Sequence, residues 1–312
     1  MRSSPPGAEP FVHPALFYRG DDEYLSALVP FLAEGLEQGG PVAVAVPGRK
    51  LELLRAALGG AADSVFMLDM SEAGRNPGRI IPGVLRAFAD KHRDTHVRII
   101  GEPIWPGRSR TEYPACAQHE ALINEAFTGR DVTILCPYDK DGLDEVALAD
   151  ARATHPVLWE SGAEAVSEAY APDVVVSRYN EPLNSPADAA RFLVDKVTLL
   201  PAMRRFVGAG AVRHGLSRDR AADLALIATE LVTNSLLHTP SARAELRLWR
   251  DGDHVTCQVR DDGHVSDPMA GRLPRTSSQP GGRGLLMVNH LADLVRIHTT
   301  PSGTTVQALC RI

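Results

Sequence analysis

Three polar side chains, Glu230, Asn234 and His238, stand four residues apart in the stretch Asp223–Pro240. On a helix, four residues advance the direction of a side chain by only about 40°, so these groups form one narrow stripe. An apolar stripe runs beside it, made of Leu224, Ile227, Ala228 and Leu231. A carboxylate, an amide and an imidazole on one line beside an apolar face are typical of the floor of a site. A solvated polar face would show the same spacing.

A further carboxylate follows a pattern of alternating apolar residues. The predicted strand Val255–Arg260 places every second residue on one apolar face, and the same period carries Asp261 onto it. A carboxylate in that position needs a hydrogen-bond donor, and the amino group of adenine is a suitable one. Gly263 then permits a tight turn against a ligand. The simpler interpretation is an ordinary strand that ends in Asp-Asp-Gly.

Glycines also precede the predicted helix Gly284–Leu291, in the sequence Gly-Gly-Arg-Gly-Leu that begins at Gly281. Free N–H groups at the start of a helix bind phosphate, and Arg283 could add a charge-assisted hydrogen bond. Glycine-rich turns are common, so this loop by itself is weak support. In the last predicted strand, the hydroxyl group of Thr304 or Thr305 could reach the edge of a base.

The order of these motifs is more specific than any one of them. Residues from about 185 to 312 resemble the GHKL, or Bergerat-fold, ATPases, and most closely the bacterial anti-sigma-factor serine kinases, through ATELVTNSLLH, VRDDG, GGRGL and GTTV. The resemblance implies ATP and Mg²⁺ as cofactors, Asn234 as the Mg²⁺ ligand, Glu230 as the general base and a lid over about 264–281. The resemblance implies a structural role for His238. The implied ATP-binding residues are Asn234, Asp261, Gly263, Gly282, Arg283, Gly284, Leu285 and Thr305.

A sensor histidine kinase shares this ATP-binding fold and is the alternative enzyme. Such a kinase carries its phosphoacceptor histidine on a helical hairpin just upstream of the ATP domain. His119–Glu120 superficially resembles that motif, but it lies far upstream and is followed by the strand-like DVTILC. We therefore disfavour histidine kinase activity.

The first half of the chain alternates short β-branched runs with helical segments, which predicts an α/β fold with a parallel sheet covered on both faces. Strands are expected at 41–46, 64–69, 97–100 and 131–136, and helices at 21–38, 49–58, 80–91 and 113–127. Polar groups fall at the carboxyl ends of strands, where such folds bind ligands. The sequence contains no GxxxxGK[ST] motif, which favours sensing or docking over ATP hydrolysis in this half.

Residues from about 11 to 160 resemble the MEDS sensory domain, first seen in the dichloromethane regulator. The resemblance rests on HPALFYRGDDEYL, GRNPGRIIP, IGEPIWPGR, HEALINEAF and LCPYD. It implies a sensory domain related in fold to RecA-like ATPases, with an unknown small-molecule signal as its ligand. The residues that we expect around that ligand are His13, Asp69, Arg75, Glu102, His119, Cys136 and Tyr138.

Some residues of this half are of types that bind metals, namely His13, Cys116, His119 and Cys136. Their spacing is not a zinc signature. Core side chains with satisfied hydrogen bonds are therefore the expected interpretation.

Composition sets the broad limits. The chain has 312 residues, which suggests two domains. A net charge of −6 and the lack of a basic patch argue against nucleic acid binding and hence against a DNA-binding regulator. Neither a membrane span nor a signal peptide is predicted, and four scattered cysteines fit a cytoplasmic protein.

The expected organisation is a disordered lead (1–10), a sensory domain (11–176), a linker (177–186) and a Bergerat-fold α/β sandwich (187–312). Within the last domain we expect a helix over 187–208 that is interrupted at Pro201. Four strands are expected at 244–249, 255–260, 294–299 and 305–311.

Together these features predict a sensor-coupled anti-sigma regulatory factor. It would phosphorylate a serine of a STAS-type anti-sigma antagonist, sequester a sigma factor, or do both. The alternative is an anti-sigma partner that binds ATP without catalysis. A homodimer is left open.

Overall fold

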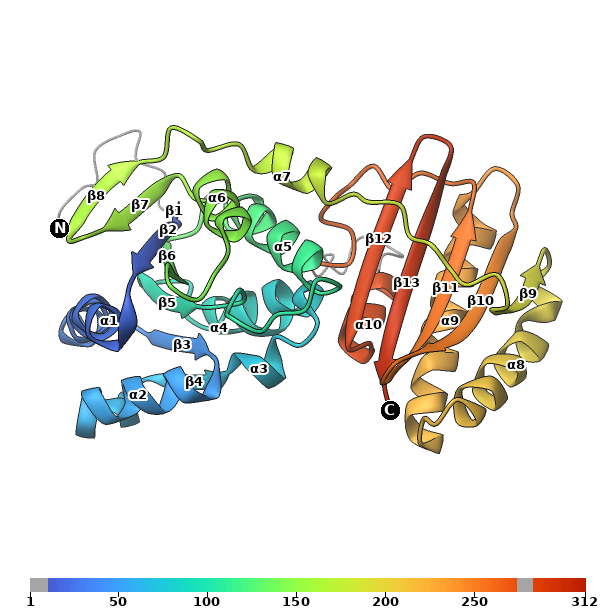
Figure 1. Ribbon diagram of the computed structural model, residues 1–312, viewed down its shortest axis with the longest axis horizontal. Helices are drawn as coiled ribbons and strands as arrows, with labels where there is room; N and C mark the ends of the chain where they lie inside the picture. The colour runs from blue at the N-terminus through green and yellow to red at the C-terminus, as the bar shows by residue number, and fades with distance from the viewer. Residues whose placement is uncertain (1–10, 274–282) are drawn as a thin grey trace. The chain divides into compact units, whose positions relative to one another are not determined.

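The computed structural model describes residues 11–273 and 283–312, and these divide into two compact units (Figure 1). The first unit comprises residues 11–75 and 80–179, and the second comprises residues 76–79 and 180–312. Gly282 and part of the predicted lid, residues 274–281, lie outside the described residues.

The first unit is built on an eight-stranded sheet, in which the order is β4-β3-β5-β6-β2-β7-β8 and β1 pairs with β6. All neighbours are parallel except β7 and β8. The strands are β1 (Phe11–Val12), β2 (Pro14–Tyr18), β3 (Val42–Val46), β4 (Phe66–Asp69), β5 (Val97–Gly101), β6 (Val132–Asp139), β7 (Val157–Glu160) and β8 (Ala163–Val166).

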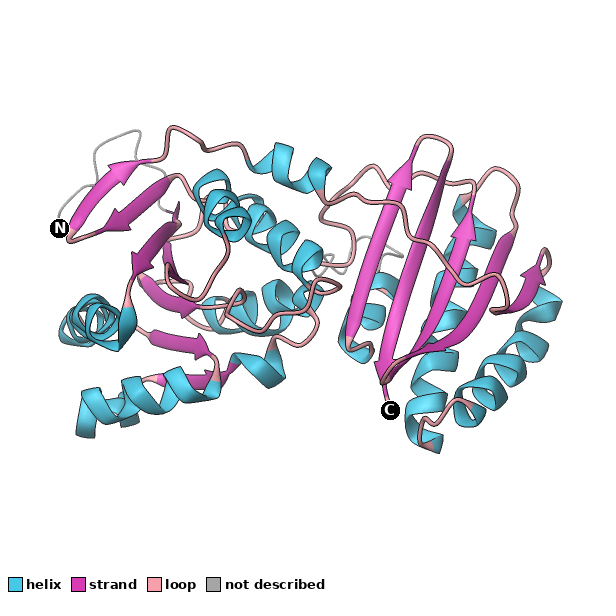
Figure 2. Cartoon of the chain, in the orientation of Figure 1, coloured by secondary structure: helices cyan, strands magenta, loops and turns pink. Residues whose placement is uncertain are grey.

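Helices cover both faces of this sheet (Figure 2). Tyr24, Leu28 and Leu54 pack with Leu16 and Val44 in a core on the face that α1 and α2 cover. The other face lies under α5, which packs against α7. The helical segments are α1 (Gly20–Glu37), α2 (Gly48–Leu58), η1 (Gly59–Ser64), α3 (Met70–Ala73), η3 (Ile81–Leu85), α4 (Arg86–Ala89), α5 (Tyr113–Ala126), α6 (Glu145–Thr154) and α7 (Pro172–Arg178).

The sequence predicted the four strands β3 to β6 but missed β1, β2, β7 and β8. β6 also continues through Tyr138 to Asp139, where an end at Cys136 was expected. The break between β1 and β2 falls at His13, before Pro14, because proline has no N–H group to donate to a neighbouring strand. This interruption hides a strand that lies between β6 and β7.

The second unit is an α/β sandwich with an antiparallel five-stranded sheet of order β12-β13-β11-β10-β9. A core of apolar side chains joins one face of the sheet to α8, α9 and α10. The elements are η2 (Pro77–Arg79), β9 (Ala190–Val194), η4 (Val197–Leu199), α8 (Leu200–Arg213), α9 (Arg218–His238), β10 (Ala244–Asp251), β11 (His254–Asp261), α10 (Gly284–Leu291), β12 (Leu294–Thr300) and β13 (Gly303–Arg311). Both units thus have the predicted fold class.

The helix expected over 187–208 is wrong in its first part. Ala190–Val194 is instead an edge strand that pairs with β10. Pro201 does not interrupt a helix but stands in the first turn of α8, where a missing N–H costs nothing and the fixed φ of proline favours helix formation. The helix prediction was therefore extended too far toward the N-terminus, because the apolar pattern before Pro201 also suits a strand.

The segment 180–185, which we expected to be linker, lies against the sheet of the second unit. Asn180 forms a clamp with Thr299: its Nδ2 donates to the Thr299 carbonyl at 2.8 Å, and its Oδ1 accepts from the Thr299 N–H at 2.9 Å. Gln307 Nε2 donates to the Asn184 carbonyl, and Arg247 donates to Ser185 Oγ, both at 2.8 Å. The segment is therefore bonded to the face opposite the helices. Among the described residues, no helix is both long and apolar enough to cross a membrane.

Candidate functional site

Helix α9 presents the polar stripe as the spacing predicted. Ser217 caps its first turn by accepting the Arg220 N–H, and its apolar residues are buried in the core of the second unit. Glu230 and Asn234 are half-buried, whereas His238, the last residue of the helix, is exposed. Glu230 and Asn234 are therefore the two candidate functional groups of the stripe.

The start of α10 lies directly over these two groups. A Cβ atom at Gly284 would stand 2.8 Å from Glu230 Oε2 and 3.4 Å from Asn234 Nδ2. Distances below 3.0 Å are not tolerated by real Cβ atoms, so glycine leaves the space that any side chain would fill. A carboxylate, an amide and the backbone at a helix N-terminus are thereby brought together from segments far apart in the sequence.

Asp261 ends β11 on the buried face, as the alternation predicted, because its neighbours Val259 and Cys257 belong to the core. Its Oδ1 accepts the Gly263 N–H at 2.9 Å, and Ser235 Oγ donates to Oδ2. These bonds fix the orientation of the carboxylate. Gly263 is required because a Cβ there would lie 2.7 Å from Thr239 Cγ2.

The prediction of Thr305 needs correction. In the β11–β13 pair, Asp261 lies opposite Thr304, and Thr305 lies opposite Arg260. Because directly opposed residues of an antiparallel pair share a face, Thr304 is the threonine beside the carboxylate, and Thr305 belongs to the other face. Thr304 Oγ1 also donates to the Gly263 carbonyl at 2.8 Å. The motif contained both threonines, but the strand register decides between them.

The remaining predicted residues surround α10. Arg283 is exposed and precedes the helix, and the side chain of Leu285 packs against the core. The side chain of Leu285 is half-buried, so its backbone N–H is the group that could bond to a phosphate. A phosphate at the α10 N-terminus would meet the N–H groups of its first turn. The carboxylate of Glu230 and the amide of Asn234, next to the first turn of α10, are groups of the kinds that bind a nucleotide with its metal ion.

The predicted sensory residues of the first unit do not form a single group. Asp69 ends β4 and caps α3, where Ser71 donates to it through both N–H and Oγ. The Arg75 carbonyl accepts a hydrogen bond from Arg108 at 3.4 Å. Asp69 therefore caps a helix, and a contact of either residue with a signal molecule stays a prediction.

Glu102 follows β5 and is 1% exposed. Tyr24 donates to its Oε2 at 3.4 Å. Burial raises the pKa of the carboxyl to about 8, although the positive charge of Lys50 acts in the opposite direction. The Lys50 ammonium lies 4.3 Å from the centre of the Tyr24 ring, a cation–π contact. Glu102 thus belongs to a buried polar group on the α1 side of the sheet.

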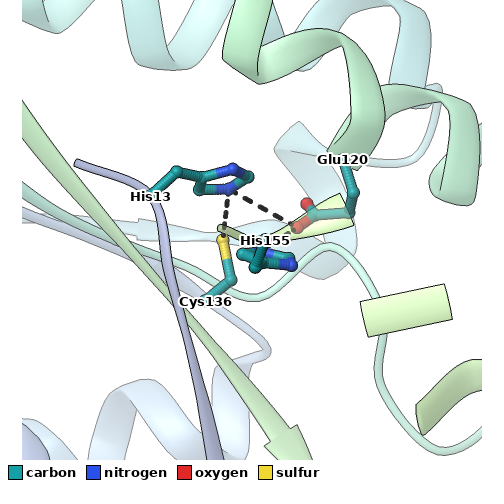
Figure 3. Close-up of side chains that lie close together, drawn as sticks. All are labelled: His13, Glu120, Cys136 and His155. Carbon is teal, nitrogen blue, oxygen red and sulfur yellow. Dashed lines mark hydrogen bonds and ion pairs between the residues drawn. The ribbon is translucent and has the colours of Figure 1, made fainter. Parts of the chain in front are cut away.

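His13, Cys136 and Tyr138 meet on the other face, around Glu120 of α5. Figure 3 shows His13 and Cys136 beside Glu120. Tyr138 donates to Glu120 Oε2 at 3.0 Å, and His155 Nε2 is 3.0 Å from the same oxygen. Burial tends to raise the pKa of Glu120, but the contact with His155 and the other histidines lowers it to about 2. Burial also lowers the pKa of His13 well below its ordinary value.

Two family models match the chain, one in each of the two units. Residues 12–156 match the family model of the MEDS domain, the methanogen/methylotroph DcmR sensory domain, and residues 193–309 match the histidine kinase-like ATPase domain. The chain joins a MEDS domain to a histidine kinase-like ATPase domain. A search of curated proteins gives no significant match.

Two solved structures show limited similarity to the chain. The RsbU and RsbW domains of Rv1364c from Mycobacterium tuberculosis are 18% identical with a TM-score of 0.30, over 39% of this chain and 32% of that one. The flagellar accessory protein FlaH from Methanocaldococcus jannaschii is 12% identical with a TM-score of 0.32, over 54% of this chain and 81% of that one. The chain therefore spans about a third of the first structure.

Sequence reasoning missed two residues of the MEDS domain. Glu120 was noticed only as part of a histidine-kinase-like motif, and His155 follows α6, which was not predicted. His119, the phosphoacceptor of that alternative, is 1% exposed within α5 and does not fit a residue that receives phosphate from a separate domain. A buried Glu next to a His within an apolar helix was the available signal, because buried carboxylates need a partner.

Proposed function

We propose that the protein is a cytosolic, sensor-coupled anti-sigma regulatory factor. Its MEDS domain binds a small-molecule signal, and its ATPase domain binds Mg²⁺ and ATP and phosphorylates a serine of a STAS-type anti-sigma antagonist. The match to the histidine kinase-like ATPase model supports nucleotide binding. The motifs of α9, β11 and α10 support the serine kinase type.

The observation that carries this proposal is the convergence of Glu230 and Asn234 beneath Gly284. In this position the Asn234 amide oxygen is a suitable ligand for Mg²⁺. The ion would neutralise phosphate charge. Glu230, one helical turn away, would accept the proton of the attacking serine hydroxyl. The Asp261 carboxylate, held by Ser235 and Gly263, would accept a hydrogen bond from the amino group of adenine.

Phosphate transfer from labelled ATP to candidate antagonist proteins tests the proposal. We expect Glu230→Gln to abolish transfer while ATP binding is retained, because the change removes the base but not the nucleotide contacts. Asn234→Ala and Asp261→Asn should each lose ATP binding. The matched control is Glu245→Gln on β10, whose carboxylate pairs with Arg247 on the sheet face opposite the helices.

Unchanged ATP binding in both Asn234→Ala and Asp261→Asn would refute the site. If wild-type protein binds ATP and a sigma factor but transfers no phosphate to any antagonist, the kinase assignment fails. The protein would then be a non-catalytic anti-sigma partner, and Glu230→Gln would leave regulation intact.

A further inference from the structure

We propose that His13, Glu120, Cys136 and His155 of the MEDS domain bind one divalent transition-metal ion of the Zn²⁺ class. Figure 3 shows that the four side chains point toward one another from different elements. His13 lies between β1 and β2, Glu120 on α5, Cys136 on β6, and His155 between α6 and β7. One ligand atom from each lies within 4.8 Å of all the others.

The distances suit a tetrahedral centre. With metal bonds of 2.0–2.3 Å, ligand atoms around a tetrahedral ion stand about 3.3–3.6 Å apart. The measured separations are 3.4 Å from Cys136 Sγ to His13 Nε2, 3.8 Å from His13 Nε2 to Glu120 Oε2, and 3.0 Å from His155 Nε2 to Glu120 Oε2. Small side-chain movements are therefore enough to close the four atoms around an ion.

Hydrogen bonds outside the cluster orient the first imidazole ring. Asn124 Nδ2 donates to the carbonyls of Ala121 and Thr154 at 3.1 and 2.8 Å, which turns its Oδ1 toward His13 Nδ1 at 3.1 Å. Because this oxygen can only accept, the neutral ring of His13 carries its hydrogen on Nδ1. Its Nε2 lone pair then faces the cluster, as in metal-binding histidines whose other nitrogen is held by an outer partner.

The same arrangement holds for His155. Its Nδ1 lies 2.8 Å from the Ala151 carbonyl, which leaves Nε2 to face Glu120. With its hydrogen on Nδ1, the neutral ring of His155 points the lone pair of Nε2 at Glu120 Oε2, 3.0 Å away. Among the described residues, Glu120 Oε1 has no hydrogen-bond partner, with His119 Nε2 3.8 Å from it, although the side chains of Glu120 and His155 are at most 1% exposed. Buried polar atoms without partners are rare and call for an explanation. A metal ion that accepts the nitrogen lone pair and faces the carboxylate supplies one.

The donor set selects the class of ion. Two imidazoles, a thiolate and a carboxylate match the ligands of Zn²⁺ and related first-row metals and do not suit Ca²⁺ or Mg²⁺, which prefer oxygen. The thiolate and the carboxylate together carry two negative charges, which a divalent ion balances. Four buried protein ligands leave no open position for water, so the centre is structural. It joins α5 to β6 and to the segments between β1 and β2 and between α6 and β7.

Metal titration of the full-length protein tests this proposal. Protein stripped of metal under reducing conditions should bind one Zn²⁺ per chain in competition with a chromophoric chelator. With Co²⁺ as the probe, the complex should show a thiolate-to-cobalt charge-transfer band. Cys136→Ser should abolish the band, and both this variant and Glu120→Gln should weaken Zn²⁺ binding by at least about 100-fold, since loss of outer partners alone costs 10–100-fold.

Cys116→Ser is the matched control, because Cys116 is a buried thiol of the same domain outside the cluster. It should bind Zn²⁺ and show the cobalt band like the wild type. Failure of the wild type to bind stoichiometric Zn²⁺, or equal affinity of Cys136→Ser, would overturn the proposal and leave a metal-free His155–Glu120 ion pair. If a variant does not fold, the band of the wild-type Co²⁺ complex still decides, since its absence excludes the thiolate ligand.

Discussion

Replacing Glu102 by glutamine should make the stability of the MEDS domain less sensitive to pH. The Glu102 carboxyl is buried, and its pKa is raised from 4.5 to about 8 in the folded protein. Because the folded-state pKa is the higher one, folding favours the protonated carboxyl. Its contribution to stability is fully present below pH 4.5 and is lost as pH rises through about 8.

The size of the loss follows from the shift. Between the two pKa values, the free energy of unfolding falls by about 1.4 kcal/mol per pH unit. The wild type should therefore lose roughly 3 kcal/mol from this group between pH 5 and pH 8. A glutamine cannot ionise but keeps an oxygen that accepts the Tyr24 hydroxyl. The Glu102→Gln variant should thus gain roughly 3 kcal/mol relative to the wild type over the same interval.

Urea unfolding at both pH values measures the effect. A Trp249→Phe background leaves Trp105 and Trp159, both in the first unit, as the fluorescent reporters. Glu52→Gln, which changes an exposed carboxyl on α2, is the control and should alter stability by less than about 0.5 kcal/mol. A stability difference between Glu102→Gln and the wild type that is the same at pH 5 and pH 8 would refute the reasoning.

Three further predictions concern other contacts. Gly284→Ala should keep its fold, because the group it meets is the flexible end of Glu230, but should lower phosphate transfer at least about tenfold; an unchanged rate in a kinase assay would contradict the assignment. Thr304→Val should weaken ATP binding more than Thr305→Val in a calorimetric titration, and the reverse order would restore the original choice. Asp150→Ala should cost about 3 kcal/mol in urea unfolding, because it removes the buried carboxylate that accepts from Tyr113, Tyr179 and the half-exposed Arg178, and a cost below about 1 kcal/mol would contradict this.

The sequence pattern predicted the features that depend only on neighbouring residues, such as helix bounds and the face on which a strand residue lies. The helix Gly284–Leu291 has the expected bounds, and Asp261 lies on the expected face of β11. The choice between Thr304 and Thr305 could not be made from the sequence, because it depends on the register with another strand. β2 was missed because Pro14 interrupts its strand pattern, and strand β9 was read as helix because five apolar-rich residues suit either structure.

The cluster around Glu120 shows more clearly that sequence patterns do not predict contacts between distant segments. His13, Cys136 and His155 come from separate elements, and no spacing between them identifies a site. Their meeting depends on β2 lying beside both β6 and β7, a pairing of strands that are distant in the sequence. Only the topology of the sheet brings them within reach of one ion.

The clamp between Asn180 and Thr299 has a mechanical consequence. Asn180 directly follows Tyr179, the last residue of the first unit, so the clamp holds the first residue of the segment 180–185. Thr299 Oγ1 in turn accepts the Val265 N–H at 3.0 Å and contacts Thr304 Oγ1 at 2.8 Å. A force on the chain at Asn180 would therefore have to break this clamp or shift the end of β12, to which Val265 and Thr304 are bonded.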